Sequence, residues 1–368
     1  MLTIIIFLAV LSALVLVHEL GHFWAARYFK VGAEEFGLGM PPRLFGFYRG
    51  VDNKWHFFWG TRDLECLVPV FKKTVYSLNW LPLGGFVRIK GENGESDETD
   101  SFASKKIWQR FIILAAGVTM NILFAGILFS ASMMIGVLQS VVEGGEVRVV
   151  EVVADSPAAV AGFMAGDTLK AVNNEALSDV AAFQGVVGAS SGQELLVTIN
   201  RSGQEQRLSV TPQDKDGQAL IGVGLDQVEM VRYPFFKAIY EGFKYALEML
   251  WLIIIAFFKL IRDLFVGTPV GDSVGGPVMI AQMTGQVARF GITNLMNFTA
   301  LLSINLAVLN FFPFPALDGG RAFLLIVEKL RGKPLKKEIE AWLNNAGFFL
   351  LMALIIFVTY RDILRLFN

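Results

Sequence analysis

Cysteine and histidine are scarce in this sequence. The single cysteine, Cys66, cannot form a disulfide within the chain, which excludes a fold held together by disulfides. Three histidines are present, so an imidazole-based metal site must draw on His18, His22 or His56. Charge of one sign is lacking too: 32 basic residues face 33 acidic ones, and a net charge of −1 gives no indication of a nucleic-acid partner.

Hydrophobic residues, by contrast, make up 54% of the chain, and the mean hydropathy is +0.52. Soluble enzymes of this size are usually less apolar, so the excess must lie in lipid or in an unusually large core. Four segments are apolar over the roughly 20 residues that a helix needs to cross a bilayer. The predicted transmembrane helices are 1–27, 109–138, 294–320 and 346–367. The first lacks a basic start and a clear cleavage site, so we interpret it as a retained span and not as a signal peptide.

The connections between these spans differ in charge. The connection 28–108 and the one between the last two spans are rich in lysine and arginine, whereas the long connection after the second span has few before its basic end. The positive-inside rule then predicts that the first two lie in the cytoplasm and that the long one lies outside, together with both termini. Arg361 and Arg365 run mildly against this orientation.

Residues 144–227 have a different pattern. Alternating β-rich runs are separated by turn-forming residues, and one short helical stretch follows Ser178. This pattern predicts a small α+β domain inserted between the second and third spans.

The region 229–270 contains a fifth apolar stretch, Ala246–Ile261. It is short and flanked by lysines and an arginine, so by composition it could cross the membrane or lie as an amphipathic helix in the interface.

His18-Glu19-Leu20-Gly21-His22 forms an H-E-x-x-H motif in the first span. On a helix, residues four apart share a face, so both imidazoles can bind one zinc ion with the glutamate beside it as general base. The alternative is that these groups only pack within a helix bundle. Ionisable groups inside a span are costly and usually functional, which favours the metal site.

A catalytic zinc ion needs a third protein ligand and an open position for water. His56 lies in the connection 28–108 and is interpreted as an ordinary loop residue. Asp318 is the better candidate, although Asp-Gly-Gly alone is a common turn. Pro313 and Pro315 precede it and break the helix at membrane depth, which is tolerated only beside protein or a wet cavity.

These motifs together resemble the site-2 protease family, and more narrowly the bacterial regulator of sigma-E protease branch. The resemblance covers nearly the whole chain. It is carried by the H-E-x-x-H motif, by Asn310-x-x-Pro313-x-Pro315-x-Leu317-Asp318-Gly319, by Gly117-x-x-x-Asn121 and by Leu83-Gly84-Gly85-Phe86-Val87. It implies that His18, His22 and Asp318 bind Zn²⁺ and that Glu19 is the catalytic base. The implied substrate-binding residues are Asn305, Asn310, Pro313, Pro315, Gly84 and Gly85.

Two of these assignments leave alternatives open. Asn305 and Asn310 match polar positions that would hold the substrate or the oxyanion, but they could equally form hydrogen bonds between helices. Residues 64–90, which alternate in places, look like the family's membrane-dipping β element, which would pair with an extended substrate. A cytoplasmic β-hairpin is the alternative.

The inserted domain resembles a bacterial PDZ domain in its Gly162-x-x-x-Gly166-Asp167 stretch. PDZ domains bind extended peptides by adding a strand to a sheet edge, so the implied partner is a peptide or a trimmed substrate end. The best-known members of the branch carry two such domains in tandem, and residues 144–227 hold one. A spacer without a binding role is the alternative.

The predicted fold class is therefore a polytopic α-helical membrane protein with four transmembrane helices, a membrane-associated β element and an extracytoplasmic PDZ-like domain. The predicted function is zinc-dependent cleavage of single-span membrane proteins in the bacterial inner membrane, for example anti-sigma factors or remnant signal peptides. The alternative is a non-enzymatic, zinc-containing scaffold that presents the PDZ-like domain. A shared zinc also requires the first and third spans to run in the same direction, so Ala246–Ile261 is expected not to cross the membrane.

Overall fold

The computed structural model describes residues 2–50, 52–61, 74–92, 98–141, 144–201, 203–215, 217–267, 275–333 and 335–367. The chain divides into two compact units. One combines Met1–Ser132 with Phe235–Asn368, and the other is the inserted segment Met133–Pro234.

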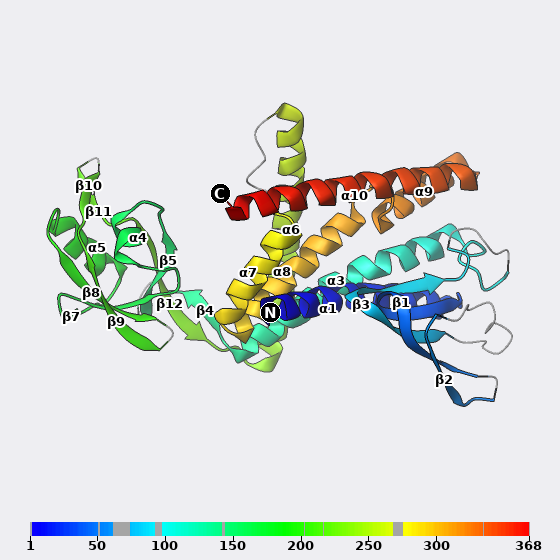
Figure 1. Cartoon of the computed structure of the whole chain (residues 1–368), viewed down its shortest axis with the longest axis horizontal. Coiled ribbons are helices and arrows are strands. Elements are labelled where there is room, and N and C mark those ends of the chain that lie inside the picture. Colours follow the sequence, from blue (N-terminus) through cyan, green and yellow to red (C-terminus); the bar gives the residue numbers. More distant parts are fainter. Residues whose placement is uncertain are drawn as a thin grey trace. The chain divides into compact units, whose positions relative to one another are not determined.

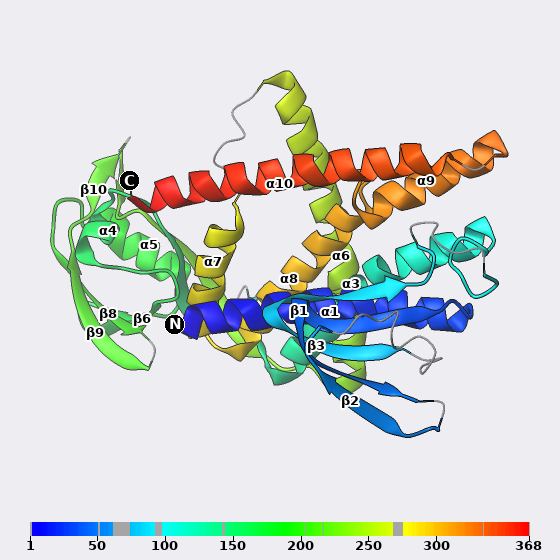
Figure 2. The same ribbon diagram turned by 45° about the vertical axis from the view of Figure 1, so that its right-hand side comes forward.

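Four helices of the first unit are long and apolar enough to cross a membrane, which confirms the predicted number within the described residues. They are α1 (Leu2–Tyr28), α3 (Ile107–Ile135), α8 (Ile292–Phe311) and most of α10 (Lys337–Phe367). The shorter helices α7 (Pro277–Arg289) and α9 (Asp318–Arg331) belong to the same unit. In both views α1, α3 and α10 run lengthwise, whereas α6 (Phe235–Val266) runs across them (Figures 1 and 2).

Three predicted boundaries were wrong, each for a local reason. The second span ends at Ile135 and not at 138, because Gly136 adopts a positive φ of 132° and the next residues form a strand. The third predicted span, 294–320, is two helices, since Pro313 and Pro315 interrupt it after Phe311. The last helix begins at Lys337 and not at 346, because a polar first turn precedes its apolar part.

A three-stranded sheet of order β2-β1-β3 packs beside α1. Its strands are β1 (Ala33–Arg49), β2 (Trp55–Trp59) and β3 (Val75–Ile89). Phe36 of β1 pairs with both Tyr76 and Val87, so β3 bends back and flanks the first half of β1 with two arms. The prediction of a β element at 64–90 is met by β3, while residues 62–73 lie outside the described residues. Strands β1 and β2 were not predicted from the sequence, and His56 lies on β2 and not in an irregular loop.

The second arm of β3 lies against α1. Ser12 Oγ donates to the carbonyl of Pro82 at 3.1 Å. A Cβ atom on Gly84 would lie 2.9 Å from Cγ1 of Val15, so only a glycine allows this close approach, and its φ of +72° also favours glycine. These contacts hold the strand against α1 just before the H-E-x-x-H motif.

The inserted unit is an antiparallel sheet covered by short helices. Its strands follow the order β4-β12-β5-β6-β8-β9, with β7 paired to β6 and a separate β10–β11 pair. Phe183 of α5 and Ile199 of β8 are among its buried core residues. The elements are β4 (Val137–Ser140), β5 (Glu146–Val152), α4 (Pro157–Ala161), β6 (Thr168–Val172), β7 (Glu175–Ala176), α5 (Val180–Ala189), β8 (Leu195–Arg201), β9 (Gln204–Val210), β10 (Gln213–Lys215), β11 (Gln218–Leu220) and β12 (Val223–Val231). The predicted bounds 144–227 were therefore too narrow, because β4 pairs with the end of β12.

The glycine-aspartate motif of this unit serves its local structure. Ser156 caps α4 by accepting a hydrogen bond from Ala159, and Gly162 ends it with a φ of 85°. Asp167, 1% exposed, accepts two hydrogen bonds of 2.7 Å from Arg201 on β8. The motif thus ties the α4–β6 connection to the sheet by a buried, bidentate ion pair.

Candidate active site

The H-E-x-x-H motif lies on the later half of α1. His18 and His22 share one helix face, each is 6% exposed, and their Nε2 atoms are 3.1 Å apart. The predicted spacing therefore brings the two imidazoles together, as expected for residues four apart on a helix.

Asp318 reaches the same point because the connection between α8 and α9 is compact. Pro313 and Pro315 prevent the helix from continuing, and α9 starts at Asp318. A Cβ atom on Gly319 would lie 2.2 Å from the carbonyl oxygen of Phe311, so this tight fold-back requires glycine. The Oδ2 atom of Asp318 then lies 2.9 Å from Nε2 of His18 and 3.2 Å from Nε2 of His22.

The triangle formed by these three atoms matches a zinc site. Two ligands at about 2.0–2.1 Å from a tetrahedral zinc ion stand roughly 3.3 Å apart, close to the observed 2.9–3.2 Å. Two imidazole nitrogens and a carboxylate oxygen are ligands that zinc accepts, and three protein ligands leave a fourth position open. Among the histidine, cysteine and acidic residues that the structure describes, His18, His22 and Asp318 form the group that could hold a metal ion.

Glu19 lies beside the triangle and is held by the sheet. Its Oε2 atom accepts a hydrogen bond of 3.0 Å from the backbone N–H of Val87 on β3. A cavity of about 200 Å³ adjoins the carboxylate, and its lining includes Val15, Leu306 and Asn310 as well as the metal-binding candidates. This space is large enough for several waters or a peptide group, since a water takes about 30 Å³.

The other predicted site residues divide into two groups. Asn310 lines the cavity, with Nδ2 3.4 Å from Nε2 of His18, whereas Asn305 is exposed and donates to the carbonyl of Leu301 on its own helix at 2.9 Å. Pro313 and Pro315 shape the connection to α9. Gly84 packs against Val15 at the cavity, and Gly85 follows it on β3.

His56 lies apart from the metal-binding candidates. Its Nε2 contacts Oδ1 of Asp52 at 3.0 Å in an exposed pair on the β1–β2 hairpin.

Helix α3 supports both imidazoles, a contact that was not predicted from the sequence. Nδ1 of His22 donates to the carbonyl of Ile113 at 2.8 Å when Nε2 faces the metal. A Cβ atom on Gly117 would lie 2.4 Å from Nε2 of His22 and 2.7 Å from Cε1 of His18. Both imidazole rings therefore pack directly against the backbone of α3 at this glycine. The Gly117-x-x-x-Asn121 motif was the signal for this contact, but a sequence does not tell what its glycine faces.

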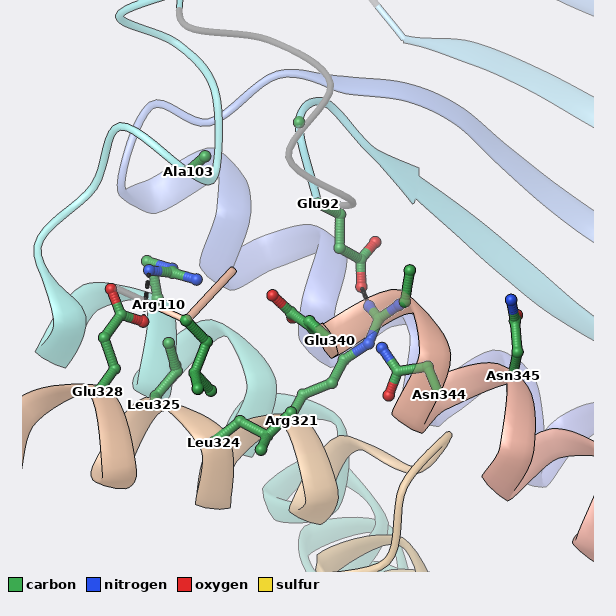
Figure 3. Close-up of a pocket in the computed structure, with 13 residues that line it drawn as sticks. Glu92, Ala103, Arg110, Arg321, Leu324, Leu325, Glu328, Glu340, Asn344 and Asn345 are labelled. Atoms are coloured by element: carbon green, nitrogen blue, oxygen red, sulfur yellow. Dashed lines mark hydrogen bonds and ion pairs between the residues drawn. The ribbon is translucent and has the colours of Figure 1, made fainter. Parts of the chain in front are cut away.

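A larger polar pocket begins one turn beyond Asp318. It has a volume of about 460 Å³ and lies between α9, the start of α3, α10 and the residues after β3 (Figure 3). Arg321 pairs with Glu92, and Arg110 lies 3.3 Å from Glu328. Burial raises the pKa of the Glu92 carboxyl, and the Arg321 guanidinium opposes this rise. These ion pairs join residues that are far apart in the sequence, so a local sequence pattern does not predict them.

The chain matches known proteins along most of its length. A model of peptidase family M50 matches residues 6–59 and 67–354. The chain is 35% identical over 364 residues to a protein of Clostridium perfringens assigned as a zinc metalloprotease, with 98% of each chain covered. It is 28% identical over 447 residues to the regulator of sigma-W protease RasP of Bacillus subtilis, with 99% of each covered. A solved PDZ domain of an SdrC-like protein from Listeria monocytogenes is 23% identical and covers 24% of this chain and 93% of its own, with a TM-score of 0.21.

Proposed function

The chain belongs to peptidase family M50, and on that premise we propose that it cuts transmembrane segments of single-span membrane proteins within the bilayer. It is a zinc metalloprotease. The proposal concerns its intramembrane substrates and the roles of the single residues. The observation that carries it is the triangle of His18, His22 and Asp318, with the Glu19 carboxylate beside it on a helix apolar enough to span a membrane.

The residues of the site divide the work of peptide hydrolysis. A zinc ion held by the triangle would acidify a bound water and polarise the scissile carbonyl. Val87 N–H holds Oε2 of Glu19, which leaves Oε1 to take the proton of the attacking water. Glu19 then gives that proton to the leaving amine. The Asn310 amide, at the wall of the cavity, is positioned to donate to the oxyanion.

The second arm of β3 is the proposed binding edge for the substrate. A helical substrate hides its carbonyls in internal hydrogen bonds, so it must unwind before cleavage. In the described sheet this arm is outermost on the side of α1, next to Glu19. An extended substrate segment that adds to it by backbone hydrogen bonds would bring its carbonyls to the cavity. We propose that water enters from the side of the polar pocket in Figure 3, whose lining includes Arg321, one turn of α9 beyond Asp318.

Removal of zinc tests the proposed function directly. The purified protein, reconstituted with a single-span reporter, is expected to cut the reporter within its membrane segment. Cleavage should stop with a zinc chelator and return when zinc is added back, because the hydrolytic water depends on the metal. Equal cleavage with and without bound zinc would contradict the proposal, and a reporter cut only outside the membrane would point to a different substrate. A scaffold with a structural zinc would show no cleavage at all.

We also propose that the inserted unit selects substrates by binding an extended peptide or a trimmed substrate end. Ser140 of β4 pairs with Val228 of β12 in the sheet. Residues 144–227 can therefore be removed and the two paired strand ends joined by a short linker. The deletion is expected to change the ratio of cleavage between an untrimmed and a trimmed substrate while zinc content stays the same. An unchanged ratio would support the spacer alternative.

The proposed topology places the inserted unit and both termini outside the cytoplasmic membrane of a bacterium, with α6 along the outer interface. The contact between Asp318 and His22 supports the placement of α6. Since α1 and α8 both end near this contact, they must run in the same direction, and α6 then cannot be a further crossing between α3 and α8. The α6 helix has large exposed apolar side chains such as Trp251 on one side, while Ala246 is buried in the core that α3 and α8 share.

Cysteine labelling tests this topology. In a Cys66→Ser background, cysteines at the exposed positions Lys237 and Arg289 are both expected to react with an impermeant reagent added from outside. A cysteine at the exposed Lys54, in the basic first connection, is the control and should stay unlabelled. Labelling of Lys237 and Arg289 from opposite sides would mean that α6 crosses the membrane.

A further inference from the structure

We infer that Asn121 is a positioning residue that orients His18 for metal binding. This inference rests on the proposed metal site. Asn121 lies on α3, is fully buried, and has its side-chain amide 3.3 Å from Nδ1 of His18. The backbone at this residue is held from a second side, since Oγ of Ser303 on α8 donates to the backbone carbonyl of Asn121 at 2.8 Å.

The chemistry of a metal-binding imidazole selects the orientation of this amide. When Nε2 of His18 binds a metal ion, the ring proton is on Nδ1, which must donate. In the orientation with Nδ2 towards His18, Oδ1 of Asn121 is buried without a hydrogen-bond partner. Rotation of the amide by half a turn exchanges the two atoms, which differ little in size, and gives the His18 N–H an acceptor.

Both imidazoles then have the same kind of support from one helix. Nδ1 of His22 donates to the Ile113 carbonyl, and Nδ1 of His18 donates to Oδ1 of Asn121, two turns further along α3. Gly117 lies between them and lets both rings rest on the backbone. Such hydrogen bonds fix the tautomer and the ring plane and make the ligand more basic. Asn121 therefore acts on zinc affinity through His18 without touching the metal.

Zinc affinity of the full-length protein in detergent, measured by competition with a chromogenic chelator, tests this role. Asn121→Leu keeps the branched shape of the side chain and removes the acceptor, so its affinity is expected to fall by about 10- to 100-fold. Asn121→Ala, made beside it in case the leucine does not fold, should show the same direction. Asn121→Asp keeps a side-chain acceptor, so this variant should bind zinc with an affinity close to that of the unchanged protein. Ser130→Ala, another buried polar position on α3, is the matched control and should leave affinity unchanged.

The outcomes separate this inference from the proposed function. If the unchanged protein and its His18→Ala variant bind zinc equally well, the metal site itself is wrong. If His18→Ala loses zinc but Asn121→Leu and Asn121→Ala bind as tightly as the unchanged protein, only the role of Asn121 is contradicted. A fall with Asn121→Asp as large as with Asn121→Leu would also overturn it, because it would mean that packing and not the acceptor matters.

Discussion

Glu19→Gln is expected to lower cleavage by about 10²- to 10⁴-fold while the protein stays folded and keeps its zinc. Glutamine has nearly the shape of glutamate, and its carbonyl oxygen can still accept the Val87 N–H, so the local geometry should persist. It cannot take a proton from water, so the reaction loses its general base. The measurement is the initial rate on a membrane-embedded reporter, together with the zinc content of the same preparation.

The control for this change is Glu241→Gln on α6, a substitution of the same type away from the cavity. It should leave both the rate and the zinc content unchanged. Retained cleavage in purified, zinc-loaded Glu19→Gln protein would sink the assignment of the base. Loss of zinc together with activity would instead show that Glu19 supports the metal.

Asp318→Ala should remove most of the bound zinc and abolish cleavage. Two imidazoles alone leave the ion short of the three protein ligands of a catalytic site and leave its charge without the nearby carboxylate. Metal analysis of the purified variant, set against about one zinc ion per chain for the unchanged protein, reports the loss. Asp318→His is a useful companion, because it keeps a metal-binding group on the first turn of α9.

His56→Ala is the matched test of the remaining histidine. His56 pairs with Asp52 on an exposed hairpin and takes no part in the described metal-binding group, so zinc content and rate should not change. The reverse pattern, with zinc lost from His56→Ala and kept in Asp318→Ala, would show that the third ligand is wrong.

The two asparagines of α8 have different surroundings, which their positions in the sequence do not predict. Asn305 and Asn310 were equal candidates, but five residues along a helix turn the side chain by roughly 140°. One of them therefore faces the cavity while the other returns its amide to its own backbone. The face of α8 that lies towards the metal site depends on how α8 packs against α1 and α3. The spacing of the two residues does not predict this packing.

Strands β1 and β2 were missed for a similar reason. Gly37, Gly39 and the consecutive prolines Pro41 and Pro42 within β1 are typical of loops, so the local pattern argues against a strand. Pairing with both arms of β3, through bulges, compensates for these residues. This pairing is long-range, and it is also what brings Val87 to Glu19.

The amino-acid sequence by itself determined the four helices that are apolar enough to span a membrane, the helical pair His18 and His22 and the glutamate between them. Hydropathy over about 20 residues and a spacing of four act along a single helix and need no partner. Only the tertiary structure decided that Asp318 closes the triangle within 2.9–3.2 Å, that Val87 holds Glu19, and that Asn121 and Gly117 lie against the imidazoles. These contacts join residues of different elements across as many as 300 positions, so they exist only after the helices have packed.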